Sequence, residues 1–320
     1  MSNTRVLVTG GAGFLGSNLV SMILDRGLGH VTIFDNFSTG RRAFFGERLG
    51  AAELTVVEGD VADYDALLRV LPGHDVVFHL AANSDIARAA IEPLIDFNNG
   101  TRLTQTLLEA MRNTGVTRIL FTSGSGVYGD VPPVPIPEDY PSTIPISTYG
   151  ASKLASEVLI SAYCHMFDFV GTVFRFANVV GPHMTHGVSH DFVHRLNADP
   201  SRLPIFGDGK QRKPYIHTDD VIAAMLLLWQ RQSEGYAYYN VGTEDQLLVS
   251  DIANIAVEEM GLTKVKYEYG GGARGWRADV PVYSLDTSKV RKLGWTNSMN
   301  SRPAVVTAIR SLIGEIADGY

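Results

Sequence analysis

Two kinds of apolar pattern alternate along the first half of the chain. Short runs rich in β-branched residues and apolar at nearly every position predict buried strands, whereas apolar residues three and four positions apart predict helices. The predicted strands cover residues 5–9, 31–34, 54–57, 75–79, 118–122 and 170–174. The predicted helices between them cover residues 14–26, 62–71, 85–112 and 148–167. This alternation is typical of a parallel sheet with helices on both faces, so we expect an α/β fold with a doubly wound, Rossmann-type parallel sheet.

The pattern loosens after about Phe176. Prolines at positions 182, 200, 204 and 214 separate shorter elements, and helices are predicted at 219–230, 250–260 and 302–316. We therefore expect residues 1–177 to form the large α/β domain and residues 178–320 to form mostly a smaller substrate-binding region. The boundary is not simple, because residues 237–242 predict one more strand that could rejoin the large sheet.

Composition argues against several classes of protein. The 320 residues are 45% hydrophobic, enough for a large core, and the net charge of −7 argues against binding to nucleic acid or to an anionic membrane. We expect neither a signal peptide nor a membrane-spanning segment, because no apolar run approaches about 20 residues. Cys164 is the only cysteine, which excludes an intrachain disulfide and fits a cytoplasmic location.

Three glycines lie between the first predicted strand and the first predicted helix. Gly10, Gly13 and Gly16 form the pattern G-x-x-G-x-x-G. Residues without a Cβ let the backbone approach a pyrophosphate, and a helix start offers amide groups and the positive end of the helix dipole. Glycine turns are common, so a purely structural turn is the alternative. The strand before and the helix after supply the context that a dinucleotide site requires.

Acidic residues follow the second and third predicted strands. Asp35 is placed to accept hydrogen bonds from adenosine ribose hydroxyls and would repel a 2′-phosphate, which favours NAD over NADP. Arg41 and Arg42 could favour NADP, but a solvated basic turn explains them better. Asp60 could meet the adenine amino group or could cap the helix predicted at 62–71, and the sequence leaves both roles open.

Tyr149 and Lys153 are four residues apart at the start of a predicted helix, so their side chains share one helical face. A nearby ammonium group favours the phenolate and should lower the pKa of the Tyr149 hydroxyl, which would make it a general base near neutral pH. The Y-x-x-x-K pattern alone also occurs by chance on ordinary helix faces. Its combination with the glycine turn is much more specific.

These motifs belong to a longer set. The set comprises TGGAGFLG (9–16), DNFSTG (35–40), GDV (59–61), HLAA (79–82), VYG (127–129), YGASK (149–153), Arg175, Asn178, GP (181–182), GDGKQR (207–212), DVP (279–281) and LGW (293–295). With these segments the chain resembles the extended short-chain dehydrogenases/reductases over almost its whole length. Within them it resembles the NAD-dependent nucleotide-sugar epimerase/dehydratase family, and the UDP-sugar 4-epimerases most of all. The resemblance implies an enzyme with NAD as cofactor, a UDP-sugar as substrate and a homodimeric assembly.

The motifs and the resemblance together suggest roles for individual residues. By resemblance, Tyr149 is the catalytic base, and Lys153 supports it and also holds the nicotinamide ribose. The residues expected to bind the cofactor are Gly10, Gly13, Phe14, Leu15, Gly16, Asp35, Asn36, Ser38, Gly40, Asp60, Val61, Leu80, Ala81, Ala82, Asn99, Ser123, Tyr149 and Lys153. The residues expected to bind the substrate are Ser125, Asn178, Thr185, Phe206, Gln211, Arg212 and Arg274.

The loop after the fifth predicted strand bears on the reaction. Related dehydratases and decarboxylases typically carry a glutamate two positions before the tyrosine of V-Y-G, and Gly126 stands there in this chain. Without that carboxylate, water elimination lacks its usual acid–base group, so we expect 4-epimerisation by oxidation and reduction at one carbon. The family's catalytic Ser or Thr, four positions before this tyrosine, is replaced by Gly124. Ser125 is the favoured catalytic substitute and Ser123 the alternative, although both could bond only the backbone or the cofactor.

Arginines are the candidate groups for the substrate diphosphate. A guanidinium can bind phosphate oxygens with two parallel hydrogen bonds, which makes it a good anchor while the sugar turns over. Arg212 and Arg274 are the first choices, and Arg277 competes with Arg274.

The identity of the sugar stays open. Thr185 and His186 are candidates for sensing the substituent at C6, and Arg88 could pair with a carboxylate, so UDP-glucose/UDP-galactose and UDP-glucuronate/UDP-galacturonate both fit. His183, His186 and His190 could in principle bind a metal, but hydride transfer needs none and we expect none. The alternatives are a nucleotide-sugar dehydratase or reductase of the same family and a non-catalytic NAD-sensing protein.

Overall fold

The computed structural model describes residues 3–83 and 88–319. Contacts between Cα atoms divide the chain into two compact units. The first contains Met1–Val127, Ser147–Arg175 and Met225–Tyr239, and the second contains Tyr128–Ile146, Phe176–Ala224 and Asn240–Tyr320. Each unit is therefore assembled from three separate stretches of the chain.

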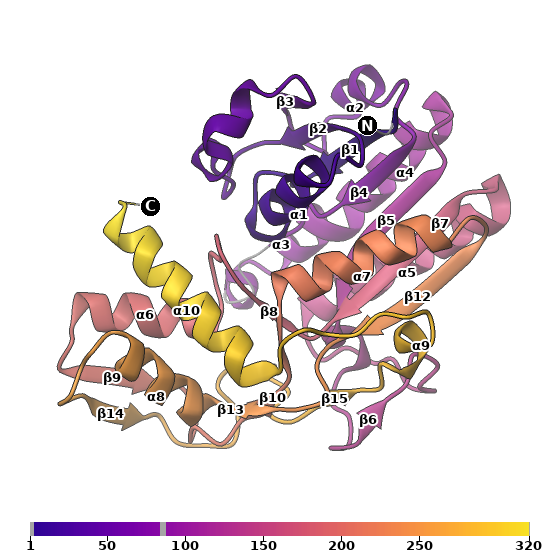
Figure 1. The fold of residues 1–320 in the computed structure, drawn as a ribbon. Helices are drawn as coiled ribbons and strands as arrows, with labels where there is room; N and C mark the ends of the chain where they lie inside the picture. The colour runs from indigo at the N-terminus through magenta and orange to yellow at the C-terminus, as the bar shows by residue number, and fades with distance from the viewer. Residues whose placement is uncertain (1–2, 84–87, 320) are drawn as a thin grey trace. The chain divides into compact units, whose positions relative to one another are not determined.

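A seven-stranded sheet forms the centre of the first unit (Figure 1). Its strands stand in the order β12 (Tyr236–Val241), β7 (Val170–Phe176), β5 (Arg118–Gly124), β4 (Val76–His79), β1 (Arg5–Thr9), β2 (His30–Asp35) and β3 (Leu54–Glu58). From β3 across to β5 the neighbouring strands pair in parallel. The chain order reverses direction between β1 and β4, which is the switch point of a doubly wound sheet. The predicted fold class is thus confirmed.

The helices of this unit begin at clear sequence signals. They are α1 (Phe14–Asp25), α2 (Tyr64–Val70), α4 (Arg102–Thr114) and α5 (Thr148–Phe167), and the second half of α7 (Thr218–Arg231) also belongs to the unit. Asp63 caps α2 and Ser147 caps α5, each by accepting a hydrogen bond from a backbone amide of the first turn. Because α5 starts one residue before Tyr149, the cap fixes where the Tyr149 and Lys153 side chains lie along the helix.

The helix predicted at 85–112 is wrong in part. Its start falls on residues 84–87, which lie outside the described residues, and the described part opens with a short 3₁₀ turn, η2 (Arg88–Ala90). A helix starts only after Pro93, as α3 (Leu94–Asp96), and runs through a π-helical turn, η3 (Phe97–Thr101), into α4. Proline fits a helix start but not a helix interior, which explains the late start.

The core of the first unit includes a large cluster in which helices α2, α4 and α5 contribute apolar side chains together with the strands. Leu107, Leu108 and Met111 recur at helical spacing on α4 and are fully buried, which is why the sequence pattern located this helix. Figure 1 shows α1 on the opposite face of the sheet from α4 and α5. Two further 3₁₀ turns, η1 (Arg42–Gly50) and η4 (Ser125–Tyr128), follow β2 and β5.

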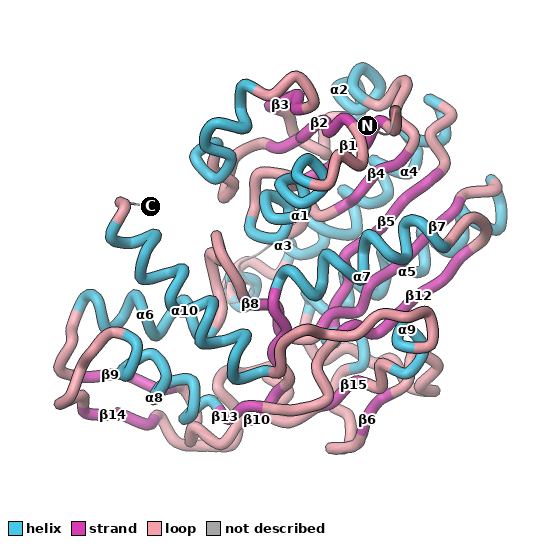
Figure 2. The backbone as a smooth tube through the Cα atoms, in the orientation of Figure 1, coloured by secondary structure: helices cyan, strands magenta, loops and turns pink. Residues whose placement is uncertain are grey.

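The described part of the second unit consists of helices and small two-stranded sheets. Its helices are α6 (Val188–Ala198), α8 (Val249–Glu259), α9 (Ser288–Arg291) and α10 (Ser301–Ala317). The paired strands are β6 (Pro135–Ile136) with β15 (Ser284–Leu285), β8 (Asn178–Val180) with β11 (Tyr215–His217), β9 (Arg202–Ile205) with β14 (Lys266–Tyr269), and β10 (Arg212–Lys213) with β13 (Leu247–Leu248). Figure 2 shows these strands as short segments joined by loops. Over residues 3–83 and 88–319, no helix combines the length and apolarity that a membrane crossing needs.

Candidate active site

Two glycines of the G-x-x-G-x-x-G turn are required by the protein itself. Gly10 has φ +69°, and a Cβ there would lie 2.6 Å from the Ala81 backbone nitrogen. A Cβ at Gly16 would lie 2.2 Å from the Gly10 carbonyl oxygen. The turn therefore closes tightly against the end of β4 and against its own helix, which explains these two glycines by packing alone.

Gly13 is different, because the protein leaves room for a side chain there. It is the N-cap of α1 with φ −80°, and a Cβ would meet only the Gly10 carbonyl oxygen, at an ordinary 3.4 Å. The first turn of α1 carries no acidic residue and receives no hydrogen bond from a capping side chain. Bare backbone at the positive end of a helix is the surface that a pyrophosphate needs, so the turn fits the predicted dinucleotide.

Asp35 holds the loop that follows β2 against this turn. Its carboxylate is buried and accepts hydrogen bonds from the backbone amides of Ala12 at 2.9 Å and Phe37 at 2.8 Å. Gly40 also packs on Ala12, where a Cβ would lie 2.8 Å from the Ala12 carbonyl carbon. Each oxygen of the Asp35 carboxylate can accept a further bond, which suits the proposed contact with ribose hydroxyls.

Asp60 does not cap the helix that follows it, because α2 starts at Tyr64 and its cap is Asp63. One oxygen of Asp60 accepts a bond from the Ala62 amide at 2.8 Å and the other from the Asn36 side chain at 3.0 Å. Asp60 therefore joins the loops after β2 and β3, and a contact with adenine stays a prediction. Arg42 is paired with Glu58 at 3.0 Å, as expected for a surface turn.

The other residues predicted to bind the cofactor lie in the first unit too. Phe14 and Leu15 form the first turn of α1, Ser38 lies in the loop after β2, Val61 follows β3, and Leu80, Ala81 and Ala82 follow β4. Asn99 lies in the π-helical turn, exposed, and its carbonyl accepts a bond from the Asn83 amide at 2.9 Å. Ser38, Val61 and residues 80–82 therefore follow the carboxyl ends of strands. Phe14 and Leu15 lie in a helix instead, and Asn99 lies in the π-helical turn before α4.

Tyr149 and Lys153 lie on one face of α5, as their spacing predicted. The Lys153 ammonium donates a hydrogen bond to the Thr122 carbonyl at 2.7 Å and lies 5.6 Å from the centre of the Tyr149 ring. The Lys153 side chain is buried, and its nitrogen also faces the Phe121 ring at 4.9 Å. The pair is thus fixed against the end of β5.

The expectation that Lys153 lowers the pKa of Tyr149 is wrong. Burial, with a smaller effect from the Asp96 carboxylate, raises the pKa of Tyr149 to about 12. Burial also lowers the pKa of Lys153 to about 8, which weakens it as a source of positive charge above that pH. Loss of hydration therefore outweighs the attraction between the two groups.

The two serines after β5 have different surroundings. The Ser123 hydroxyl is buried and donates to Glu157 at 2.5 Å, and Glu157 forms a buried ion pair with Arg175 at 2.7 Å. Ser125 lies in the η4 turn, is partly exposed, and makes no hydrogen bond through its hydroxyl to any described residue. Its hydroxyl is therefore available to a ligand, and its catalytic role stays a prediction.

Gly126 lies directly beside Tyr149. A Cβ at position 126 would be 4.0 Å from Cδ1 of the Tyr149 ring and 3.6 Å from the Gly150 Cα. These are ordinary contacts, so the backbone has room for a side chain at this position. A carboxylate there would stand next to the proposed base, and this chain has none.

In the second unit, the last residue of the GDGKQR segment, Arg212, and the next residue, Lys213, form the short strand β10. Arg212 and Lys213 are adjacent on β10, so their side chains point to opposite sides, and only Arg212 is exposed. Lys213 forms an ion pair with Asp279, whose carboxylate also accepts from the Gly275 amide at 2.9 Å. Arg274 donates to the Asp279 carbonyl. Lys213, which sequence reasoning missed, therefore shares a cluster with Arg274.

Arg274 is the better placed of the two competing arginines. It binds Asp130 through both guanidinium nitrogens, at 2.8 and 3.1 Å, and both side chains are partly exposed. Arg277 is exposed two residues before Asp279. A ligand anion could replace the exposed Asp130 partner of Arg274.

Phe206 and Gln211 lie together in the loop between β9 and β10. The Phe206 ring is 58% exposed, with the Arg195 guanidinium 4.4 Å from its centre. Gln211 is buried, its side-chain nitrogen donates to the Phe206 carbonyl at 3.4 Å, and its side-chain oxygen has no partner among the described residues. An exposed ring beside an unused acceptor is suited to a flat base that offers an N–H group.

Two other predicted substrate residues also lie in the second unit. The Asn178 side chain donates to the Pro214 carbonyl at 3.2 Å and to the Tyr283 hydroxyl at 3.1 Å, which fixes its orientation. Thr185 lies before α6, and its hydroxyl is 3.2 Å from Nδ1 of the exposed His186 ring. Across the described residues, no group of three His, Cys, Asp or Glu side chains could hold a metal ion.

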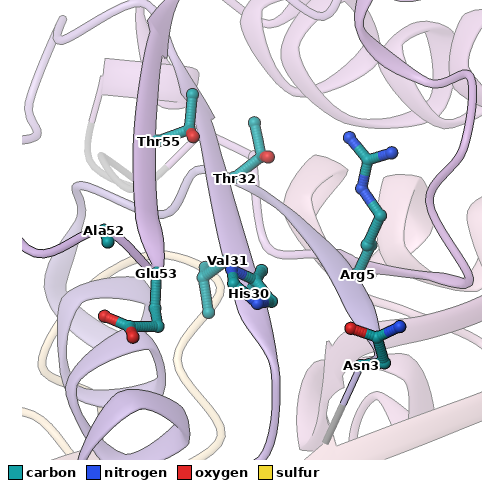
Figure 3. Close-up of a pocket in the computed structure, with 8 residues that line it drawn as sticks. All are labelled: Asn3, Arg5, His30, Val31, Thr32, Ala52, Glu53 and Thr55. Carbon is teal, nitrogen blue, oxygen red and sulfur yellow. The ribbon is translucent and has the colours of Figure 1, made fainter.

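A separate hollow of about 320 Å³ lies at the amino ends of strands β1, β2 and β3 (Figure 3). Its lining comes from β1, β2, β3 and the residues just before them: Asn3, Arg5, His30, Val31, Thr32, Ala52, Glu53 and Thr55. Thr32 and Thr55 face each other in the parallel pairing of β2 with β3. Arg5 and Thr9 are opposite ends of β1, so this hollow is distinct from the glycine turn.

A doubly wound sheet with a Tyr149–Lys153 pair beyond its glycine turn defines the extended short-chain dehydrogenases/reductases. The chain belongs to the NAD dependent epimerase/dehydratase family, whose model matches residues 6–242. The predicted family and the predicted cofactor, NAD, are thereby confirmed.

Curated relatives and solved structures agree with this assignment. A UDP-glucose 4-epimerase of Azospirillum brasilense is 32% identical over 332 residues, which cover 97% of this chain and 92% of that protein. A crystal structure of UDP-galactose 4-epimerase is 36% identical, with a TM-score of 0.86, and the match covers 98% of this chain and 100% of that one. A dTDP-glucose 4,6-dehydratase from Streptomyces venezuelae with NAD bound is 28% identical, with a TM-score of 0.89 and 99% of both chains covered. Overall shape therefore does not separate epimerases from dehydratases, and local chemistry must.

Proposed function

We propose that this protein is a UDP-sugar 4-epimerase that inverts carbon 4 of the sugar through a transient 4-keto stage. The relatives support this reaction class, and Gly126 is the observation that carries the choice against a dehydratase. Bound NAD supplies a hydride acceptor at C4, the return of that hydride, and a positive ring that favours a nearby phenolate.

Tyr149 is the group that handles the proton of the 4-hydroxyl. It accepts that proton while C4 is oxidised and returns one when C4 is reduced. Lys153 stabilises the phenolate stage from its fixed position on the Thr122 carbonyl. Ser125, whose hydroxyl is available, would relay the proton between the sugar and Tyr149.

Because Gly126 has no side chain, no acid or base at position 126 accompanies Tyr149. A side chain at position 126 would begin 4.0 Å from the Tyr149 ring, in ordinary contact. Elimination of water needs an acid and a base at a second carbon, whereas epimerisation needs proton transfer at the 4-hydroxyl only. Replacing the carboxylate by glycine therefore supports chemistry confined to C4.

The substrate's nucleotide part is assigned to the second unit. Lys213 and Arg274 are proposed to bind the diphosphate, because both are held by Asp279 and an ion pair of Arg274 is exposed. Arg212 faces away from this cluster, so it is the weaker candidate. Phe206 and Gln211 are proposed to bind the uracil, as a ring surface and an acceptor for its N–H.

The choice of sugar stays a proposal. Arg88, the candidate partner of a uronate carboxylate, is paired with Glu92 at 2.9 Å, so UDP-glucose and UDP-galactose are the first pair to test.

We also propose a homodimer formed through α5, whose exposed residues include Val158, Ala162 and Met166 at helical spacing. Analytical ultracentrifugation tests the assembly, and a monomer at assay concentration would refute it. A cytoplasmic location stays a prediction.

The fate of a deuterium label at C4 tests the reaction. NAD-loaded protein is incubated with UDP-glucose deuterated at C4, without added reductant, and the products are read by NMR and mass spectrometry. We expect UDP-galactose with the label still at C4 and no net NADH. Label at C6 with a lost water would instead identify a dehydratase, and label lost to free cofactor would identify a reductase. The same incubation with the uronate pair decides the sugar.

A further inference from the structure

Asp96 is a buried carboxylate in the first unit that the proposed chemistry does not use. It is 2% exposed, and among the described residues no Lys, Arg or His forms an ion pair with it. Its two oxygens accept hydrogen bonds from the Asn83 side chain at 2.8 Å and from the Thr148 hydroxyl at 2.7 Å. Burying a carboxylate with only neutral partners costs free energy that an apolar residue would not cost. Its bond to Thr148, the residue before Tyr149 on α5, suggests what this cost serves.

A second set of bonds holds Asp96 firmly to α5. The Ser152 hydroxyl donates to the Asp96 carbonyl at 2.7 Å, and the Thr101 amide donates to the Ser152 oxygen at 3.0 Å. A Cβ at Gly100 would lie 2.2 Å from that same oxygen, so the close approach requires glycine there. Because Thr148 and Ser152 are one turn apart on α5, the carboxylate is fixed relative to the helix that carries Tyr149.

The charge of Asp96 reaches both members of the Tyr149–Lys153 pair. Burial is the main cause of the raised pKa of Tyr149, and the Asp96 charge raises it further, because an anion disfavours the phenolate. Burial lowers the pKa of Lys153, while Glu157 and then Asp96 act to raise it. Asp96 therefore acts in the same direction on both groups and makes each keep its proton to higher pH.

The other charged groups around the pair are accounted for within the described residues. Glu157, one turn beyond Lys153 on α5, is neutralised by its buried ion pair with Arg175 from β7. His79 on β4 is fully buried, and burial lowers its pKa to about 3, so it is neutral in the working range. Asp96, bonded to Thr148 just before Tyr149 in the chain, is thus the nearby carboxylate that no described Lys, Arg or His pairs with.

We propose that Asp96, buried and fixed to α5 through Thr148 and Ser152, is a positioning residue whose charge sets the pH range of the reaction through Tyr149 and Lys153. The phenolate of a phenol that keeps its proton more strongly accepts the sugar's proton better, although this phenolate form exists over a narrower pH range. The inference rests on the proposed role of Tyr149 in epimerisation.

Asp96→Asn tests this proposal, because it keeps the shape and removes the charge. The pH profile of kcat/KM is measured for the NAD-loaded wild type and variant, and both limbs should move to lower pH by about one unit. An independent readout is the ionisation of Tyr149 followed by NMR of ring-labelled tyrosine, with the signal identified by its loss in Tyr149→Phe. The Tyr149 titration should move to lower pH in the variant.

Matched variants separate charge from structure. Glu92→Gln removes an exposed acid four residues before Asp96 and should leave the profile in place, since solvent screens it. Thr148→Val removes a hydrogen bond and keeps the charge, so it should not move the limbs to lower pH. Asp96→Ser gives the same expected shift if Asp96→Asn does not fold. An unshifted Tyr149 titration in both neutral variants would overturn the proposal. Absence of epimerase activity in the wild type would refute the proposed function instead, because the titration needs no turnover.

Discussion

The glycine turn allows a prediction in which two neighbouring substitutions separate stability from binding. Gly10→Ala places a methyl group 2.6 Å from a backbone nitrogen at a residue with φ +69°, whereas Gly13→Ala places one at an ordinary 3.4 Å from the Gly10 carbonyl oxygen at φ −80°. If Gly13 is glycine only because a pyrophosphate lies against it, alanine there should harm NAD binding and little else.

The magnitudes follow from these geometries. A left-handed conformation costs a non-glycine residue about 1–2 kcal/mol, and overpacking adds about 1–3 kcal/mol, so Gly10→Ala should lower the free energy of unfolding by about 2–5 kcal/mol. Alanine in place of glycine at an N-cap costs only about 0.5 kcal/mol, which is the expected loss for Gly13→Ala. The affinity of Gly13→Ala for NAD should fall about tenfold or more, equivalent to about 1.4 kcal/mol.

Urea denaturation of the cofactor-free proteins gives the stabilities, and calorimetric titration with NAD gives the affinities. Both are needed because NAD itself stabilises the folded state. Wild-type affinity in Gly13→Ala would show that the turn is structural only. Equal destabilisation by the two substitutions would show that the space beside Gly13 is not real.

Two further predictions concern the reacting groups. Tyr149→Phe keeps the ring and removes the hydroxyl, so NAD content should be unchanged while kcat falls by about 10²–10⁴; near-normal turnover measured with UDP-glucose would remove Tyr149 from its role. Ser125→Ala should lower kcat more than KM, whereas Ser123→Ala should mainly lower the free energy of unfolding, by about 1 kcal/mol, because its hydroxyl is bonded to buried Glu157. Equal and small kinetic effects of the two serine variants would mean that the site works without a serine relay.

The sheet and most helices could be predicted because their signals are local. A parallel sheet buried on both faces forces apolar residues into continuous runs, and α4 and α5 carry apolar residues at helical spacing over 13 and 20 residues. The helix predicted at 148–167 agrees with α5, and the Ser147 side chain caps its start. These features depend on a few neighbouring residues and little else.

Elements that depend on tertiary contacts could not be predicted as well. The π-helical turn at Phe97–Thr101 adds a residue to a helical turn, and the composition of this segment does not predict it. α6 carries Val188, Phe192 and Leu196 at helical spacing, yet it is missing from the predicted helices. The strands of two residues in the second unit are too short to have a period.

The candidate site shows the same division between residue identity and environment. Spacing placed Tyr149 and Lys153 on one face of α5, but it could not reveal that burial would raise the pKa of the tyrosine. The sequence suggested Arg212 as an anion ligand because of its charge, whereas the alternation of β10 turns Lys213 toward Asp279. Asp96 carries no motif at all, and only its burial beside α5 makes it a candidate.

The same fold carries two reactions in this family, so a small number of side chains must decide between them. The match to a dehydratase, with a TM-score of 0.89, is as good as the match to an epimerase, with a TM-score of 0.86. Both reactions begin with oxidation at C4, and they differ in whether an acid and a base act at a neighbouring carbon. Position 126 lies beside Tyr149 and could hold such a group, but glycine supplies none. The backbone there has room for a side chain, since a Cβ would meet no atom closer than 3.6 Å. Reaction choice in this chain is therefore assigned to one missing carboxylate beside Tyr149 and not to the shape of the fold.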